Sequence, residues 1–192
     1  MDEPPTISIL LLGDSDCGKS TFLSKLSHGA GSMRQKTTSL LLLRDLDQPF
    51  VWDIRMYNRP YRFEFYDTAC PENYTLLRPD FVILCFGIDD RRSLVNLQYV
   101  WFKRAVECYM RDRENIPVMV LGLKRDLRKE EEGIIYPQEG LKVAQDLRCD
   151  RYAECSATTG ELMNEVIEDI ARTAAKTTTE AGGMSQGGCV AM

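Results

Sequence analysis

Apolar runs and segments of helical periodicity alternate along this chain. Continuous apolar stretches at 7–12 and 81–86 are typical of strands that are buried on both faces of a sheet. Five further segments favour strands, at 39–43, 50–56, 61–66, 116–121 and 152–155. The sequence "YNRP" at 57–60 predicts a hairpin turn between two of them.

The segments between these strands predict helices. The clearest is 93–110, whose apolar residues recur at helical spacing: Leu94, Leu97, Trp101, Ala105 and Cys108. Helices are also predicted at 19–27, 137–147 and 161–176. Alternating strands and helices predict an α/β fold with a mostly parallel sheet covered on both sides. Ligands of such sheets bind beyond the carboxyl ends of the strands, so we expect the chemistry in the loops there.

Composition narrows the functional classes. The 192 residues, 44% hydrophobic and 28% charged, suit one soluble domain. A net charge of -5 argues against nucleic acid as the main partner, since no excess of Lys and Arg is available for phosphates. The seven cysteines include no CxxC pair, which argues against a zinc site or a disulfide framework and favours a reducing compartment. No apolar run has the length of a membrane span, and the acidic N-terminus does not resemble a signal peptide.

A phosphate-binding loop follows the first predicted strand. The sequence "GDSDCGKS" at 13–20 matches G-x-x-x-x-G-K-[ST] and opens a predicted helix, a context that disfavours a chance glycine-rich turn. In such a loop backbone N–H groups surround phosphates, the lysine reaches the β- and γ-phosphates, and the final hydroxyl binds Mg²⁺. The candidate nucleotide-binding residues here are Gly13, Ser15, Asp16, Cys17, Gly18, Lys19, Ser20 and Thr21, with Ser20 also a metal ligand.

Two later loops extend this pattern. After the strand at 116–121 comes "GLKRDLR" with Lys124 and Asp126, and after 152–155 comes "ECSATTGE" with Ser156 and Ala157. Together with "DTA" at 67–69, these motifs make the chain resemble the small GTPases of the Ras superfamily. The segments "LLRP", "LCFGIDDRRSL", "KRDLR" and "YAECSATTG" resemble the Rho branch most, and the resemblance covers about residues 7–175.

The resemblance implies a three-layer P-loop NTPase fold, a Ras-like G domain with a six-stranded, mostly parallel sheet flanked by helices. It implies that Asp126 selects guanine, that the Lys124 stem packs on the base, and that the Ala157 amide meets guanine O6. It also implies that Ser156 is one of the nucleotide-binding residues. From the residues alone, Asp126 could instead cap a helix and Lys124 could be a surface charge. The resemblance also implies metal binding by Ser20, by Asp67 through water, and by Thr38, although Thr37 or neither threonine could take that last role.

Several family positions are altered in this chain. Where the family has Gly and then Gln after Asp67, this chain has Cys70 and Pro71, and proline has no group to orient the attacking water. Ser15 stands in place of a phosphate-loop glycine, and Asp16 adds a negative charge near the expected phosphates. We therefore assign no catalytic residue and expect intrinsic GTP hydrolysis to be slow or absent.

Three further departures concern the base site and two other segments. Leu123 stands where the family has Asn or Thr, which removes a hydrogen bond and lowers the expected affinity. The helix that Rho proteins insert before the 137–147 helix is expected to be absent, and the segment between Pro79 and Phe81 is shorter than in the family.

The C-terminal segment 177–192 predicts a flexible tail after a G domain at 1–176. It ends in "CVAM", a C-a-a-X box in which Cys189 is the prenylation site; the final Met favours farnesyl, and geranylgeranyl stays open. No Lys or Arg follows Lys176, and one lipid alone binds membranes weakly. We therefore expect exchange between the cytosol and the cytoplasmic face of a membrane, the plasma membrane first, or a lipid-shielding partner.

The expected function is that of a monomeric signalling switch. Mg²⁺ and GTP would hold two switch segments that effector proteins read, with an exchange factor or an activator as further partners. Three alternatives stay open: a GTPase whose catalysis a partner rescues, a pseudo-GTPase scaffold that needs no nucleotide cycle, and an ATP-using P-loop enzyme.

Overall fold

The computed structural model describes residues 4–29, 49–56, 59–68, 77–111, 116–129 and 132–182. Several expectations lie outside these residues. They are the strand at 39–43, the switch threonines Thr37 and Thr38, the substituted positions Cys70 and Pro71, and the prenylation site Cys189. Of the hairpin turn expected at 57–60, residues 57–58 lie outside them, and Arg59 and Pro60 belong to a strand.

The described strands form one six-stranded sheet in the order β2-β3-β1-β4-β5-β6. Strands β3, β1, β4, β5 and β6 run parallel to one another, and β2 pairs with β3 in the antiparallel direction. The expected mostly parallel six-stranded sheet is therefore confirmed. The strand bounds are β1 Thr6–Leu12, β2 Phe50–Met56, β3 Arg59–Thr68, β4 Phe81–Gly87, β5 Val118–Leu123 and β6 Arg151–Glu154.

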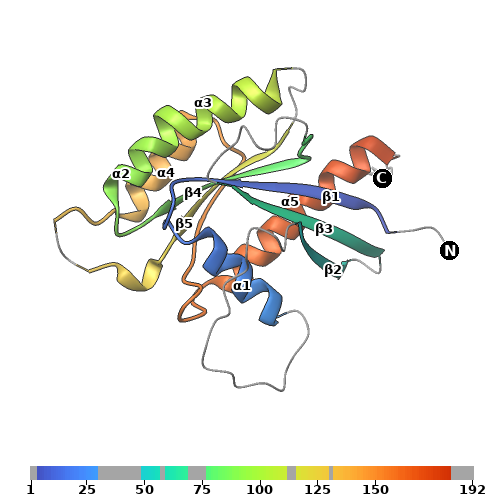
Figure 1. Cartoon of the computed structure of the whole chain (residues 1–192), viewed down its shortest axis with the longest axis horizontal. Coiled ribbons are helices and arrows are strands. Elements are labelled where there is room, and N and C mark those ends of the chain that lie inside the picture. The colour runs from blue at the N-terminus through green and yellow to red at the C-terminus, as the bar shows by residue number, and fades with distance from the viewer. Residues whose placement is uncertain are drawn as a thin grey trace, which may run out of the picture.

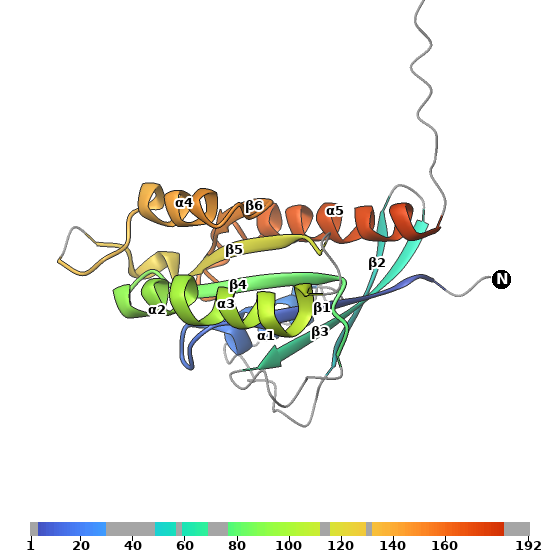
Figure 2. The same cartoon turned by 90° about the horizontal axis from the view of Figure 1, so that it is seen from above.

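Helices cover both faces of this sheet, as Figures 1 and 2 show. One face carries α1 (Lys19–Gly29) and α5 (Met163–Gly182), whose apolar residues join the cluster built on Ile9, Leu11 and Phe63. The other face carries α4 (Pro137–Asp146) and the 91–110 helix, which pack on Leu10, Leu12 and Val82. The sheet between two helical layers is the α/β architecture that the sequence predicts.

The 91–110 helix is irregular along its length. It consists of α2 (Arg91–Asn96), a π-helical turn (Leu97–Trp101), α3 (Phe102–Ala105) and a second π-helical turn (Val106–Met110). It begins two residues before the predicted start because the Asp90 side chain accepts a hydrogen bond from the Arg92 backbone N–H and so caps the helix. Its inner face buries Leu94, Leu97 and Trp101 in the core.

Several other element bounds differ from the sequence prediction. Strand β3 extends two residues further than expected at each end, because its first residues pair with β2 and its last residues pair with β1 as far as Thr68. Strand β5 begins at Val118 rather than at residue 116, and the proline at 117 explains this shift because it lacks a backbone donor. Helix α5 continues to Gly182, so residues 177–182, which the sequence assigned to the flexible tail, are helical.

Between β5 and α4, Arg125–Leu127 form a 3₁₀ turn. The other residues described in this segment, 124, 128–129 and 132–136, are not helical. Among the described helices, none combines the length and the apolar character that crossing a bilayer requires.

Candidate functional site

The phosphate loop joins the end of β1 to the start of α1 and holds its lysine tightly. The Lys19 ammonium donates hydrogen bonds to the carbonyl oxygens of Gly13 and Asp14, both at 2.9 Å, and is almost fully buried. Gly18 has a φ of +112°, a conformation that side chains disfavour, and a Cβ at Gly13 would overlap the Cys85 carbonyl oxygen. The two glycines of the motif are therefore required by the backbone geometry as well as by the ligand chemistry.

The two described metal candidates meet beside this loop. Because β1 pairs with β3 in the register Leu11 to Asp67, the Asp67 carboxylate lies next to the start of α1. The Ser20 hydroxyl donates to Asp67 Oδ2 at 2.5 Å, and Lys19 Nζ lies 3.9 Å from Asp67 Oδ1. Two protein oxygens at the end of a phosphate loop fit Mg²⁺, which is bound by one or two carboxylates together with substrate phosphates. Among the described residues, no group of three or more His, Cys, Asp or Glu side chains forms a separate metal site.

The base-side loop after β5 is fixed by the loop after β6. Lys124 adopts a left-handed φ of 60°, and the chain then turns through Arg125–Leu127. The Asp126 carboxylate accepts a 2.5 Å hydrogen bond from the fully buried Ser156 hydroxyl, and the Arg125 N–H donates to the Cys155 carbonyl at 3.1 Å. Ser156 therefore orients Asp126. Lys124 forms an ion pair at 3.2 Å with Asp89, which lies in the loop after β4.

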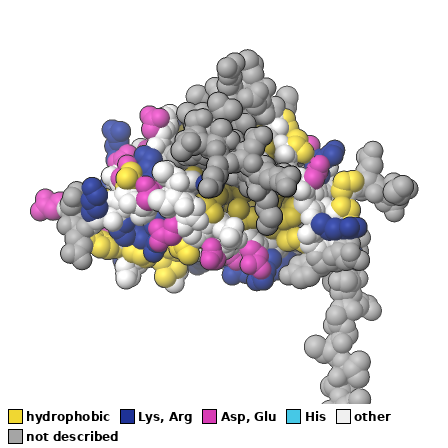
Figure 3. Space-filling view, turned by 90° about the horizontal axis from the view of Figure 1, so that it is seen from below, with side chains coloured by type: hydrophobic (Ala, Val, Ile, Leu, Met, Phe, Trp, Pro, Cys, Tyr) yellow, Lys and Arg dark blue, Asp and Glu magenta, His cyan; other side chains and the backbone are white. Residues whose placement is uncertain are grey.

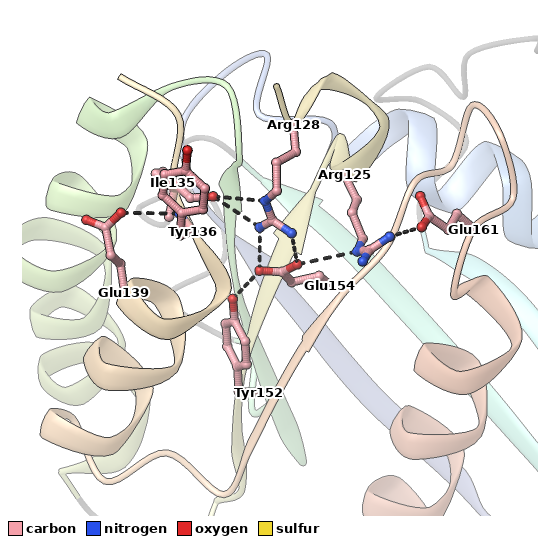
Figure 4. A network of polar contacts seen from close by, with 8 residues as sticks. All are labelled: Arg125, Arg128, Ile135, Tyr136, Glu139, Tyr152, Glu154 and Glu161. Atoms are coloured by element: carbon pink, nitrogen blue, oxygen red, sulfur yellow. Dashed lines mark hydrogen bonds and ion pairs between the residues drawn. The ribbon is translucent and has the colours of Figure 1, made fainter. Parts of the chain in front are cut away.

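A buried carboxylate behind the base-side loop gathers three donors, as Figure 4 shows. Glu154 accepts two 2.7 Å hydrogen bonds from the Arg128 guanidinium, one hydrogen bond from the Tyr152 hydroxyl, and an ion pair from Arg125 at 3.6 Å. Arg128 also donates to the carbonyl oxygen of Ile135. Because Arg125 and Arg128 flank Asp126, this Glu154 network clamps the loop that carries the candidate base-selecting residue.

One cavity of about 520 Å³ joins the phosphate side to the base side. Its walls are Asp16, Gly18, Lys19, Ser20, Thr21, Leu123, Lys124, Asp126, Leu127, Ala157 and Thr158. Most of the residues expected to bind nucleotide therefore lie around a single space. Four do not line it: Cys17 and Ser156 are buried, Ser15 is exposed, and the Gly13 carbonyl accepts a hydrogen bond from Lys19.

Two substituted positions are part of the cavity wall. Asp16 is exposed and has a φ of +63°, a left-handed conformation that is uncommon for residues other than glycine. Leu123 is buried, and its Cβ lies 3.4 Å from where a Cβ on Gly18 would stand, so the leucine packs directly under the phosphate loop. An apolar contact thus occupies the position where the family has a hydrogen-bonding side chain.

The sequence did not point to every residue of this site. Leu127 and Thr158 line the cavity, and their only sequence signal is their position beside Asp126 and Ala157. Asp89 binds Lys124 from the loop after β4, which the rule on carboxyl ends of strands could have indicated. Burial raises the pKa of the Cys17 thiol above its ordinary value, so this cysteine behaves as an apolar support for the loop.

Comparison with known proteins agrees with this geometry. The model of the Ras family matches residues 8–176. The chain is 31% identical over 180 residues to the GTP-binding protein rho5 of Schizosaccharomyces pombe, covering 85% of this chain and 84% of that protein. It is 28% identical to rho1 of the same organism over 182 residues, with 86% and 85% covered, and 28% identical to RHO2 of Saccharomyces cerevisiae over 178 residues, with 86% and 87% covered. The chain therefore belongs to the Ras family and is a Rho-like small GTPase.

Proposed function

We propose that this protein is a switch that binds guanine nucleotides but hydrolyses GTP slowly or not at all. The observation that carries the proposal is the single cavity in which Lys19 and Ser20 face Asp126 and Ala157. This arrangement suits a ligand with phosphates at one end and a purine at the other. Bound Mg²⁺ would supply charge neutralisation between the phosphate oxygens, with Ser20 and Asp67 as its protein partners.

Two substitutions support impaired hydrolysis. Pro71 stands where the family has the glutamine that orients water, and Ser15 stands in the phosphate loop where the family has glycine. Phosphoryl transfer depends almost entirely on positioning and charge stabilisation, and a trans-acting arginine is worth about 10³–10⁵ in rate. A chain that has lost the water-orienting group and crowds the approach of an arginine is expected to remain loaded with GTP.

The released nucleotide tests this proposal directly. The full chain is purified from cells, denatured, and the nucleotide is identified by chromatography. We expect GTP in near-equal molar amount to protein. Predominant GDP would show that hydrolysis proceeds despite Pro71, and the impaired-hydrolysis proposal would be wrong.

A second candidate function is a scaffold that needs no nucleotide cycle. It is favoured by the buried Leu123, which places an apolar side chain where the family has a hydrogen-bonding one. In that case the purified protein would contain neither GTP nor GDP, and added guanine nucleotide would bind only weakly. The same chromatography separates the two candidates.

We further propose that the protein acts at membranes and through partners. Prenylation of Cys189 would attach it reversibly to the cytoplasmic face of a membrane, the plasma membrane first, because one lipid chain binds weakly. Effectors would read the switch segments, and an exchange factor, an activator or a lipid-shielding chaperone would complete the set for a monomeric switch. Metabolic labelling with a prenyl analogue tests the lipid: label is expected in the wild-type chain and none in Cys189→Ser.

A further inference from the structure

An aspartate inside the phosphate loop is tied to a distant helix. The Asp14 carboxylate accepts a 2.7 Å hydrogen bond from the Trp101 indole N–H at Oδ1 and another of 2.7 Å from the Asn96 side-chain amide at Oδ2. Both donors are neutral, and both come from the 91–110 helix, more than 80 positions away. The negative charge of a phosphate-loop residue is thereby held against the helix by two directed contacts.

The π-helical turn makes this pair of contacts possible. In an α-helix, residues five positions apart point about 140° away from each other. Here the Phe102 N–H bonds to the Leu97 carbonyl five residues back, as in a π-helix, so residues five apart lie on nearly the same side. Asn96 and Trp101 are such a pair, and both therefore reach one carboxylate. This gives a physical purpose to an irregularity that apolar periodicity alone does not reveal.

The same aspartate also holds the phosphate-binding lysine. The Asp14 backbone carbonyl accepts a 2.9 Å hydrogen bond from Lys19 Nζ. The Trp101 ring is buried, and the Arg104 guanidinium lies 5.7 Å from its centroid, so the indole that holds Asp14 is itself fixed. A continuous series of contacts thus runs from the 91–110 helix through Asp14 to Lys19.

We infer that Asp14 is a positioning residue for nucleotide binding. Its carboxylate, held by Asn96 and Trp101, fixes the phosphate loop so that Lys19 and the loop N–H groups are aligned for phosphates. The 91–110 helix thereby sets the lifetime of the bound nucleotide, although it does not line the nucleotide cavity. This inference rests on the proposed guanine-nucleotide binding.

The dissociation rate of a fluorescent GDP analogue from the full chain tests the inference. Asp14→Ala removes both contacts, and Trp101→Phe removes one donor while keeping a buried ring. Each is expected to speed dissociation by about tenfold, because each loses a hydrogen bond to a charged group. Val95→Ala, an exposed position on the same helix, is the control and is expected to leave the rate unchanged.

Asp14→Asn separates hydrogen bonding from charge. Its amide oxygen still accepts from the indole, and its amide nitrogen can donate to the oxygen of a rotated Asn96 side chain, so the rate is expected to stay within about threefold of wild type. A rate as fast as that of Asp14→Ala would assign the effect to charge and overturn the inference. So would wild-type rates in both Asp14→Ala and Trp101→Phe.

Phosphorus NMR provides a readout that a merely stabilising contact would not alter. The resonance of the bound GDP β-phosphate is expected to shift in Trp101→Phe and to keep its wild-type position in Val95→Ala. An unchanged resonance together with a lowered melting temperature would make the contact purely structural and overturn the inference.

A wild-type chain that binds no guanine nucleotide would contradict the proposed function but would not test the role of Asp14. The effect of the Asp14 contacts on the phosphate loop is then measured without ligand, as amide hydrogen exchange of residues 13–20. Faster exchange in Trp101→Phe than in wild type is expected, whereas equal exchange would overturn the inference as well.

Discussion

At the scale of single residues, the site depends on side chains that hold other side chains. Ser156 orients Asp126, and Glu154 holds the arginines on either side of it. These supporting residues are more buried than those they support. Breaking one of their contacts would leave a polar group unpaired away from water, which costs free energy. The Asp126 carboxylate, the proposed base-selecting group, is thus held in place by contacts within the protein.

The Glu154 network predicts a large effect from one substitution. Glu154→Ala leaves Arg128 without its carboxylate partner in a largely buried position, and we expect a loss of about 3 kcal/mol in the free energy of unfolding. Urea denaturation followed by circular dichroism measures it. The matched control is Glu165→Ala, an exposed carboxylate on α5, for which the change should stay below about 0.5 kcal/mol. Equal effects of the two changes would contradict the role of the network.

At the scale of elements, the packing of helices on the sheet can outweigh the helix propensity of a single residue. Gly140 lies inside α4, where glycine is a poor helix former. A Cβ at this position would overlap the Tyr152 hydroxyl on β6, so the glycine lets the helix approach the strand closely. The close contact between α4 and β6 therefore explains a glycine that helix propensity disfavours.

Replacing this glycine with alanine should therefore destabilise the protein, whereas the same change would stabilise an isolated helix. Gly140→Ala raises helix propensity by about 1 kcal/mol but forces Tyr152 to move, and overpacking typically costs about 1–3 kcal/mol. We expect a net decrease in melting temperature of a few degrees, measured by calorimetry. Gln138→Ala, at an exposed position of the same helix, should leave the melting temperature nearly unchanged.

The contact between the 91–110 helix and α4 should make stability depend on pH. The hydrogen bonds from Arg91, one of them 2.6 Å long, lower the pKa of Glu139 from its ordinary value of 4.5. The stabilisation is thus fully present above that ordinary value and is lost as the pH falls through the lowered, folded-state pKa. Both side chains are partly exposed, so a few tenths of a kcal/mol are expected.

Urea midpoints at neutral pH and at pH 3 measure this contribution. Glu139→Gln keeps an acceptor for the Tyr136 N–H but cannot ionise, so its two midpoints should differ less than those of wild type. An unchanged pH dependence in the variant would exclude the Arg91 contact as its source.

At the scale of the whole molecule, one sheet brings four loops and the end of a fifth strand to the same edge. Described residues of the loops after β1, β4, β5 and β6 surround the cavity or hold its walls, and Asp67 at the end of β3 lies beside Lys19. A ligand that binds there touches segments from both ends of the chain. It should therefore stabilise the fold as a unit.

Added guanine nucleotide is accordingly expected to raise the melting temperature. With GDP and Mg²⁺ at about 100 times the dissociation constant, binding adds about 2.7 kcal/mol, or about 5–10 °C for a chain of this size. Thermal scanning of nucleotide-stripped protein measures the shift. ATP at the same concentration should produce a much smaller shift, and Asp126→Asn should lose most of the difference between the two nucleotides.

The fold class and the position of the phosphate loop could be predicted from the sequence, and so could the two loops after β5 and β6 as candidate binding segments. They could be predicted because apolar periodicity reports burial along each element, and because the order of strands and helices limits a parallel sheet to few topologies. Element ends were less certain: capping by Asp90 and pairing of β3 with β1 moved them by two residues.

Contacts between side chains that are far apart in the sequence could not be predicted in this way. The contact of Asp14 with Trp101 joins residues 87 positions apart, and it needs a π-helical turn that no periodicity predicts. Likewise, Leu123 indicated only a lost hydrogen bond, whereas the structure places its side chain under Gly18. A sequence specifies how often apolar residues recur, but the direction and partner of each side chain depend on how the elements pack.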